Sequence, residues 1–584
     1  MARPPSRSDA GLLAAYLRPE QAQLLVLGMV LVVAMLMPVA GPVLLGHAID
    51  AALDGEPTSE IVRLAAGFLV VTVGSDALQV LVAYRSVGLA WRIGNRLRLD
   101  LARHALRLDL DWHAGHSAGL LIERIDGDVA AIVEFSSLAV LQLLGNAILV
   151  AGVLVVSFLI DWRAGLLILG SVTVASYLLI RLRSVAVPAH DAEREIQSDL
   201  YGDLEERLGG LEDLRSLDAG EYVVHRLEHH SSRWWHAARR AALLGDGAYT
   251  AAATAFSLGS VLTLGVGVAL QRNGVITLGS LLAVFRFSQM VRQPIERIAE
   301  QMREFQKAAA GARRAARLLA TAPTLPDGRG DHLLPGPLRV DLDDVAFAYA
   351  GDTDVLVDLD LHLAPGTRLG VVGRTGSGKS TLGRLLARLW DVTNGSVRLG
   401  GVDVRDAATD DLRRRVAVVS QDVELLRASL RDNLTFLGTV DATDDEMRAA
   451  LADVGLAGWA ASLDDGLDTV LEGGSGLSAG QAQLLAFARV LLADPGLVLL
   501  DEATSRLDPE TETRLAEAAD RALRGRTVVI IAHRLATLDR VDEVLVLERG
   551  RVLEHGRREA LAADPTSEFA RLLAMSDAAR AVLS

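Results

Sequence analysis

Apolar stretches without charge recur along the first half of the chain, and their lengths match the thickness of a lipid bilayer. A helix needs about 20 residues to cross about 30 Å of hydrocarbon. Residues 24–45 and 247–271 carry no charge, and residues 64–84 carry a single acid, Asp76. Two further runs, before and after residues 161–163, are also uncharged, which predicts a tight helical hairpin. We therefore expect six membrane helices, at about residues 24–45, 61–84, 135–160, 164–180, 247–271 and 278–293.

Arginine is distributed unevenly over the connections between these runs, and this predicts their orientation. The long connections, residues 85–134 and 181–246, are rich in arginine, whereas each short connection on the other side holds at most one. Because cytoplasmic loops retain positive charge, both termini are predicted to be cytoplasmic and the protein to lie in the cytoplasmic membrane. Apolar residues recur at helical spacing within both long connections, which indicates helices that continue beyond the bilayer.

The pattern changes in the second half of the chain. Residues 320–337 concentrate proline and glycine and are interpreted as a linker. From there on, short apolar strands alternate with helical stretches, which is typical of an α/β domain. We therefore expect a transmembrane domain over residues 1–319, the linker, and an α/β domain over residues 338–584.

Composition agrees with this division and excludes several functions. Half of the residues are apolar and the mean hydropathy is +0.29, which is high for a soluble protein. The net charge is −15 and no basic patch dominates either half, so nucleic acid is not an expected partner. The chain has no cysteine, which excludes disulfides, thiolate metal sites and cysteine nucleophiles.

A glycine-rich loop between a strand and a helix carries the first chemical signal. The stretch VVGRTGSGKST, residues 371–381, fits the pattern G-x-x-x-x-G-K-[ST], in which loop N–H groups surround nucleotide phosphates. Of 59 basic residues only Lys307 and Lys379 are lysines. A compact ammonium can enter such a loop, whereas a planar guanidinium is too wide. Lys379 is therefore interpreted as a phosphate ligand and Ser380 as a ligand of Mg²⁺.

Two later apolar strands end in polar side chains that suit the same chemistry. Residues 497–500 are followed by Asp501, a candidate magnesium ligand, and by Glu502, which suits the polarisation of an attacking water. A further strand ends at His533, which could hold a γ-phosphate. The stretch LSAGQ, residues 477–481, precedes a helical run and thus offers the free N–H groups of a helix N-terminus.

These features together resemble an ATP-binding cassette (ABC) half-transporter of the exporter fold, over nearly the whole chain. GRTGSGKST resembles the Walker A loop, LVLLDEAT the Walker B strand and LSAGQ the signature motif usually written LSGGQ. SQD resembles the Q-loop, SRLD the D-loop, IIAHRLAT the switch-histidine segment, and TVLEGGSG the loop before the signature. The resemblance implies an all-α six-helix transmembrane domain joined to an α/β P-loop NTPase domain with a helical signature subdomain.

The resemblance also implies roles for single residues, with ATP and Mg²⁺ as cofactors. Glu502 would be the general base, His533 the γ-phosphate clamp and Gln421 a magnesium contact that senses the membrane domain. Tyr349 of VAFAY would stack on adenine, and Asp508 belongs to the D-loop. Magnesium would be held by Ser380, Gln421 and Asp501. The phosphates would contact Gly373, Arg374, Thr375, Gly376, Ser377, Gly378, Lys379, Ser380 and Thr381. Turns near residues 109–116 and 214–220 would couple the membrane domain to the cassettes.

In the resembled family, the signature of one subunit completes the ATP site of the other, so this chain is expected to dimerise. Ser478, Ala479, Gly480 and Gln481 would then contact the ATP of the partner. Ala479 replaces the usual glycine and adds a methyl group where the backbone must approach a phosphate. A neutral variant and a heterodimer with one working site both fit this change, and the heterodimer is slightly favoured.

The transport direction and substrate stay open at this point. The expected function is ATP-driven export of a hydrophobic or amphipathic small molecule or lipid by alternating access. An exporter-fold importer, for example of siderophores, and an ATP-gated channel or regulator are the alternatives. Arg286 and Gln289 share a helical face on the sixth run with Gln293, and charged residues in membrane spans usually face a cavity or a partner. A purely structural pairing, for instance with Asp76, is equally compatible.

Overall fold

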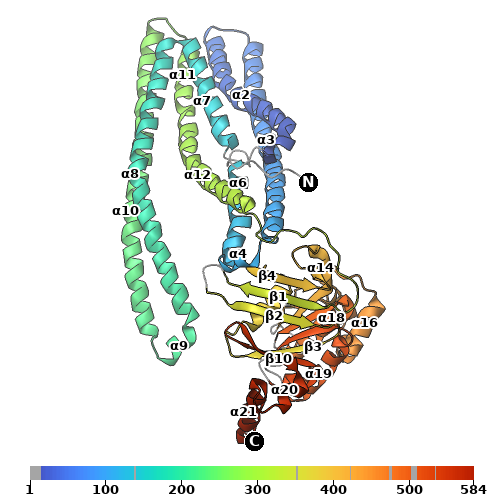
Figure 1. Ribbon diagram of the computed structural model, residues 1–584. Helices are drawn as coiled ribbons and strands as arrows, with labels where there is room; N and C mark the ends of the chain where they lie inside the picture. The colour runs from blue at the N-terminus through green and yellow to red at the C-terminus, as the bar shows by residue number, and fades with distance from the viewer. Residues whose placement is uncertain are drawn as a thin grey trace. The chain divides into compact units, whose positions relative to one another are not determined.

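The computed structural model describes residues 15–136, 140–349, 353–420, 423–472, 477–501, 509–532 and 535–583. The chain divides into two compact units. The membrane unit consists of Met1–Arg107 and Ser117–Thr321. The cassette unit consists of Leu108–His116 and Ala322–Ser584, so it includes a short segment from the first long connection (Figure 1).

The described part of the membrane unit is helical. Its longer helices are α2 (Gln21–Leu53), α3 (Thr58–Ala105), α7 (Val140–Ile160), α8 (Trp162–Gly209), α10 (Gly220–Arg272), α11 (Leu278–Met290) and α12 (Arg292–Ala320). Shorter turns lie between them: η1 (Arg18–Glu20), α5 (Ala118–Ile122), the π-helical η2 (Glu123–Gly127), α6 (Asp128–Glu134) and α9 (Leu211–Ser216). At 1.5 Å per residue, the 48 residues of α3 or α8 extend about 72 Å, more than twice the hydrocarbon thickness.

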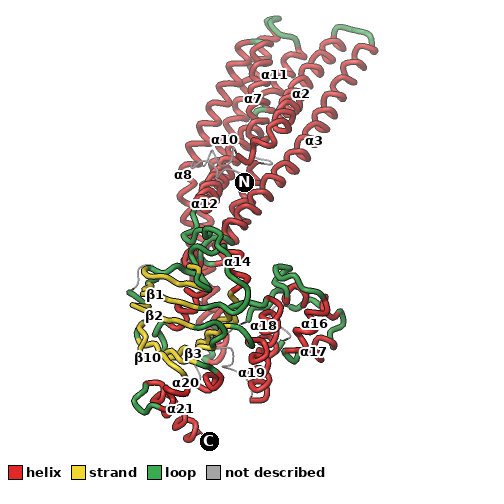
Figure 2. The backbone as a smooth tube through the Cα atoms, turned by 45° about the vertical axis from the view of Figure 1, so that its right-hand side comes forward, coloured by secondary structure: helices red, strands yellow, loops and turns green. Residues whose placement is uncertain are grey.

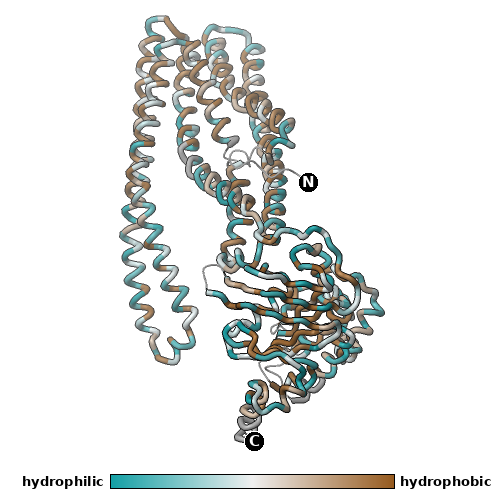
Figure 3. The backbone as a smooth tube through the Cα atoms, viewed as in Figure 1, coloured by the Kyte–Doolittle hydropathy of each residue, from teal (hydrophilic) through white to brown (hydrophobic). Residues whose placement is uncertain are grey.

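The long helices combine an apolar segment with a polar extension. In Figure 3 the apolar residues of α8 and α10 gather in the halves away from α9, and the halves next to α9 are mostly polar. The two helices lie side by side and are joined through α9 (Figure 1). This arrangement is the one expected for spans that continue as helices outside the bilayer.

Five helices of the described chain are long and apolar enough to cross a membrane. They are Ala15–Leu53, Thr58–Ala105, Gln142–Ile160, Trp162–Gly209 and Gly220–Arg272. The sixth run is divided at Val291 into α11 and α12. With 13 residues α11 is too short to span a bilayer, and the 29 residues of α12 carry too many charges, so a sixth span stays a prediction. Pro294 explains the division, because a proline ring clashes with the carbonyl four residues earlier, and α11 ends at that residue, Met290.

Several polar contacts join helices of the membrane unit, and two of them involve aspartates. Asp50 near the end of α2 accepts hydrogen bonds from the Gly279 amide at 2.8 Å and from the Thr277 hydroxyl at 2.6 Å, which caps the start of α11. Asp128 at the start of α6 is buried and binds the guanidinium of Arg314 on α12, with Nε 2.9 Å from one carboxylate oxygen. Both contacts join helices that are far apart in the sequence.

The cassette unit contains two sheets (Figure 2). The smaller, antiparallel sheet has the order β2-β1-β4-β5 and the larger has the order β10-β9-β3-β8-β7-β6. In the larger sheet β9, β3, β8, β7 and β6 are parallel and β10 is an antiparallel edge. The strands are β1 (Val340–Phe347), β2 (Leu356–Leu363), β3 (Arg368–Gly373), β4 (Asn394–Leu399), β5 (Val402–Asp403), β6 (Val416–Val419), β7 (Leu497–Asp501), β8 (Thr527–Ile531), β9 (Glu543–Glu548) and β10 (Arg551–Arg557).

The helices of the cassette unit pack around several apolar clusters, and a smaller one includes Val544 of β9 and Phe569 of α21. One core joins both sheets to α13 and includes Leu342, Leu369 and Leu382. A second lies between the β6–β7 side of the large sheet and a helical region, and includes Leu451 and Phe487. The helices are α4 (Leu110–Ala114), α13 (Lys379–Leu386), α14 (Thr409–Arg415), α15 (Leu430–Leu434), α16 (Asp444–Asp453), α17 (Ala457–Ala461), α18 (Ala479–Ala493), α19 (Pro509–Leu523), α20 (Arg558–Ala563) and α21 (Glu568–Leu583), with 3-10 turns η4 (Gly466–Asp468) and η5 (Leu535–Arg540).

The proline- and glycine-rich stretch after α12 is packed against the cassette. Leu333 is buried and its amide donates to the Asp411 carboxylate at 2.7 Å. Arg388, itself almost fully buried, donates to the Pro326 carbonyl at 2.8 Å. Residues 322–337 therefore belong to the cassette unit, and we call this segment the strap.

Candidate functional site

The candidate nucleotide site lies at one edge of the large sheet. Strands β3, β8 and β7 are parallel neighbours, so their carboxyl ends, at Gly373, Ile531 and Asp501, meet at the same edge. Ligands of open α/β sheets bind outside the carboxyl ends of the strands. Glu502 directly follows the end of β7, and His533 lies two residues past β8, but both lie outside the described residues.

The loop after β3 has a backbone that glycine alone adopts without strain. Gly373, Gly376 and Gly378 have positive φ angles of 150°, 80° and 100°. A Cβ at Gly373 would overlap the carbonyl oxygen of Leu547 on the neighbouring strand β9. The spacing of glycines predicted from the sequence is thus required by the local geometry, and the loop leads directly into α13.

Lys379 is the first residue of α13 and points back into this loop. Its side chain is buried, with 6% exposed, and its ammonium donates to the carbonyls of Gly373 at 2.8 Å and Arg374 at 3.0 Å. No side chain caps the N-terminus of α13, which leaves its first N–H groups directed out of the helix.

The donors of the loop fit a nucleotide triphosphate. The hydroxyl of Ser377 is buried and has no hydrogen-bond partner among the described residues. That hydroxyl, the ammonium of Lys379 and the amides at the start of α13 are all donors, and all lie on one short segment. A polyanion is the class of ligand that such a set of donors stabilises.

Tyr349 lies next to the same loop. Its hydroxyl is 3.2 Å from the Thr381 hydroxyl and accepts a hydrogen bond from Arg384 at 2.9 Å. Its ring packs edge-on against Phe347 and Trp390, with centroids 4.8 and 5.5 Å apart. The expected aromatic contact for adenine is therefore within hydrogen-bonding distance of the phosphate loop. Arg384 and Trp390 were not among the predicted site residues, although both lie within eleven residues of Lys379.

The signature stretch forms the start of α18. Ser478 is the N-cap, its hydroxyl accepts from the Gln481 amide at 3.2 Å, and the Gln481 side chain accepts from the Ser478 amide at 3.0 Å. This reciprocal capping box fixes the first turn of the helix. Ala479 is exposed and Gly480 is buried, so the methyl group of Ala479 lies on the surface of this unit, and the core does not cover it.

The buried Arg489 on α18 is a residue that the sequence analysis missed. Its guanidinium donates to the backbone and side-chain oxygens of Asn433, at 2.8 and 3.2 Å, and to the Glu424 carbonyl at 3.3 Å. Burial lowers the pKa of this guanidinium from its ordinary value. Arg489 therefore connects the signature helix α18 to the segment that contains Glu424 and Asn433. The predicted site residues Gln421 and Asp508 lie outside the described residues. The sequence signal for a buried, paired arginine was that Arg489 is the single charged residue of an apolar helix.

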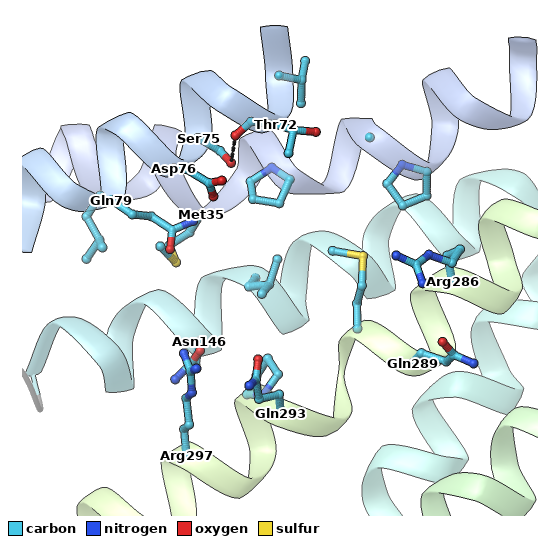
Figure 4. Close-up of a pocket in the computed structure, with 18 of the residues that line it drawn as sticks. Met35, Thr72, Ser75, Asp76, Gln79, Asn146, Arg286, Gln289, Gln293 and Arg297 are labelled. Carbon is cyan, nitrogen blue, oxygen red and sulfur yellow. Dashed lines mark hydrogen bonds between the residues drawn. The ribbon is translucent and has the colours of Figure 1, made fainter. Parts of the chain in front are cut away.

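A second candidate site is a cavity of about 600 Å³ inside the membrane unit. Residues from α2, α3, α7, α11 and α12 line it (Figure 4). Two prolines of α2, Pro38 and Pro42, form part of its wall, and Asp76, Arg286 and Arg297 are its charged residues. The sequence predicted that Arg286, Gln289 and Gln293 face a cavity or a partner, and all three line this cavity. Arg297 continues the same spacing and was missed.

The chain matches two family models. They are "ABC transporter transmembrane region", over residues 24–295, and "ABC transporter", over residues 356–505. The β-(1→2)-glucan export ATP-binding/permease protein of Rhodopseudomonas palustris is 30% identical over 90% of this chain and 88% of that protein. The ATP-dependent lipid A-core flippase of Desulfotalea psychrophila is 28% identical over 80% of this chain and 81% of its own length. A multidrug efflux ATP-binding/permease protein of Mycobacterium bovis is 33% identical over 80% of this chain and 39% of its own length. The predicted order, a helical membrane domain followed by an α/β nucleotide-binding domain, is confirmed.

Proposed function

Because this chain belongs to the exporter-type ABC transporters, we propose that it exports an amphipathic small molecule or lipid across the cytoplasmic membrane as half of a dimer. Its enzymatic activity is the hydrolysis of ATP coupled to transport. The observation that carries the proposal is the presence, on one chain, of a complete phosphate loop and of an open, partly polar cavity lined by helices of the membrane unit.

Nucleotide binding rests on the loop between β3 and α13. The ammonium of Lys379 balances phosphate charge, the backbone N–H groups of the loop donate to phosphate oxygens, and Ser377 adds a hydroxyl from within the loop. Tyr349 provides an aromatic face for adenine. ATP with Mg²⁺ supplies the phosphoanhydride bond whose cleavage drives the cycle.

Hydrolysis requires groups that position water and charge. We assign Glu502 as the base that accepts a proton from the attacking water, and His533 as the donor to the γ-phosphate. We assign the residues that hold Mg²⁺ as Ser380, Gln421 and Asp501. Asp501 ends β7 at the same sheet edge as the phosphate loop, which supports its part in this set.

Half-transporters of this family dimerise, and the signature stretch indicates what the partner receives. Ser478 and Gln481 fix the first turn of α18, so the N-terminus of this helix is rigid and exposes Ala479. We propose that this end of α18 contacts the nucleotide held by the partner. We favour a heterodimer slightly, because the methyl group of Ala479 would stand between this backbone and the partner's phosphate.

Alternating access would follow from the length of the helices. Helices of about 72 Å reach well beyond the bilayer, so closure of two cassettes on nucleotide would move their cytoplasmic ends and, through rigid helices, the walls of the cavity. The orientation with cytoplasmic termini is part of the proposal.

The test is reconstitution of the protein into proteoliposomes with external ATP. We expect ATP-dependent movement of a labelled amphiphile into inside-out vesicles, lost in a Glu502→Gln variant. Movement in the opposite direction would favour an importer. Ion current at constant ATP without amphiphile movement would favour a channel, and either result would overturn export.

A further inference from the structure

The cavity of the membrane unit contains a polar stripe along its last two helices. Arg286 and Gln289 of α11, and Gln293 and Arg297 of α12, all line the cavity and point into it in Figure 4. Arg286 and Gln289, three residues apart, share a side of α11, and Gln293 and Arg297, four residues apart, share a side of α12. Polar groups therefore line the cavity on both sides of the division at Val291.

The charges in this cavity do not cancel. Its charged lining residues are Arg286, Arg297 and Asp76, which gives two positive charges and one negative. Neither arginine forms an ion pair with Asp76 or with another acid whose side chain the structure describes, a set that leaves out Glu300. Figure 4 shows Asp76 on α3 beside Ser75 and Gln79, away from both arginines. The structural pairing with Asp76 that the sequence left open is therefore not formed.

Arginines within a membrane domain are costly and usually serve a ligand or an ion pathway. A guanidinium presents a planar fork that binds phosphate or carboxylate in a bidentate manner, and the side chains of Arg286 and Arg297 are exposed to the cavity. The neutral amides of Gln79, Gln289 and Gln293 can donate hydrogen bonds to the same kind of group.

The rest of the wall is apolar. Met35, Pro38, Phe68, Leu149 and Met290 contribute apolar surface to the same cavity. A bound molecule would therefore find a positively charged polar stripe and an apolar wall within one space. This combination fits a molecule that has an anionic headgroup and a hydrocarbon tail.

We propose that this cavity binds amphiphiles with an anionic phosphate or carboxylate headgroup, and that Arg286 and Arg297 select for that charge. The proposal rests on the proposed function, because it names the substrate class of the pump. Asp76 lines the cavity on α3, away from the two arginines, and its negative charge disfavours a second anionic group there.

The experiment uses the full-length protein in phosphatidylcholine nanodiscs and three amphiphiles with the same tail. They are dodecyl phosphate, dodecylphosphocholine and dodecyltrimethylammonium, with dioleoyl phosphatidic acid as a two-chain lipid arm. Retention is measured by native mass spectrometry and by the concentration that gives half-maximal change in ATP hydrolysis. We expect dodecyl phosphate to bind on the order of tenfold more tightly than the cationic probe, since charge-assisted bonds are about twice as strong as neutral ones.

The variants separate the stripe from general effects of charge. Arg286→Gln and Arg297→Gln should each weaken dodecyl phosphate on the order of tenfold, whereas Arg286→Lys should recover part of the loss. Arg272→Gln is the matched control, because it removes the same charge at the end of α10 and Arg272 does not line the cavity. Asp76→Asn should tighten dodecyl phosphate, which gives a measurable gain even if an arginine variant fails to fold.

Equal retention of the anionic and cationic probes would overturn the proposal, as would arginine variants that behave like Arg272→Gln. ATP-driven transport of a cationic amphiphile would leave the pump intact and refute only the charge preference. Selective binding of dodecyl phosphate without ATP-driven movement would support the site and refute the pump. Preference for dioleoyl phosphatidic acid over dodecyl phosphate would identify a membrane lipid as the source of the headgroup.

Discussion

We expect the substitution Asp109→Asn to weaken the coupling between ATP hydrolysis and transport. Asp109 directly precedes α4, yet its side chain does not cap that helix. Instead its carboxylate accepts hydrogen bonds from the amide of Thr324, from the Thr324 hydroxyl at 2.7 Å and from the Leu325 amide at 3.3 Å. Leu108–His116 consequently belongs to the cassette unit, although the chain on both sides belongs to the membrane unit.

The expected magnitude follows from these three bonds. A hydrogen bond to a charged group contributes about 1.5–3 kcal/mol when buried, but this contact is partly exposed to solvent, so its net worth is smaller. Asp109→Asn removes the charge and turns an amide N–H₂ toward donors. We expect a loss of about 1–2 kcal/mol in the attachment of α4 to the strap, which is roughly a 5- to 30-fold shift of that equilibrium.

The assay compares ATP hydrolysis with and without a transported amphiphile in nanodiscs. Asp109→Asn should lower the ratio of stimulated to basal hydrolysis several-fold, because α4 is attached to the cassette more weakly. Asp111→Asn is the matched control, since Asp111 is exposed and has no hydrogen-bond or ion-pair partner among the described residues. Thr324→Val removes the hydroxyl partner and completes a double-mutant cycle with Asp109→Asn.

Two results would refute this reasoning. One is a ratio for Asp109→Asn that equals the ratio for Asp111→Asn. The other is strict additivity of Asp109→Asn and Thr324→Val, because contacting residues should show a coupling energy of at least about 0.5 kcal/mol.

Three further predictions concern the nucleotide site. Lys379→Arg keeps the charge, but the loop that encloses the ammonium has no room for a guanidinium, so hydrolysis should fall at least about 100-fold, and near-normal activity would contradict the assignment. Glu502→Gln should retain ATP binding and slow hydrolysis by about 10²–10⁴, measured in single-turnover experiments, and an unchanged rate in a complex whose other site is inactive would exclude Glu502 as the base. This chain expressed alone should hydrolyse ATP poorly if Ala479 belongs to a heterodimer, whereas a stable homodimer that is active at both sites would make Ala479 neutral.

Local patterns in the sequence determined the membrane helices and the phosphate loop. Charge-free runs of about 20 residues predicted the membrane helices because hydrocarbon excludes charge over a fixed thickness. The phosphate loop was recognisable because positive φ angles demand glycine at Gly373 and Gly378, and because a lysine was retained at Lys379 in a chain that otherwise uses arginine. Such features depend on neighbours within a few residues, so the order of residues alone specifies them.

Contacts between distant segments were decided by the tertiary structure. Asp76 and Arg297 line one cavity although 221 positions separate them, and Asp109 meets Thr324 across 215 positions. No periodicity connects such pairs, because which side chains meet depends on how long helices and strands pack. The same holds for Arg489, whose partner Asn433 is 56 positions away. Packing supplies the partner of each buried charge, and the sequence shows only that a partner is required.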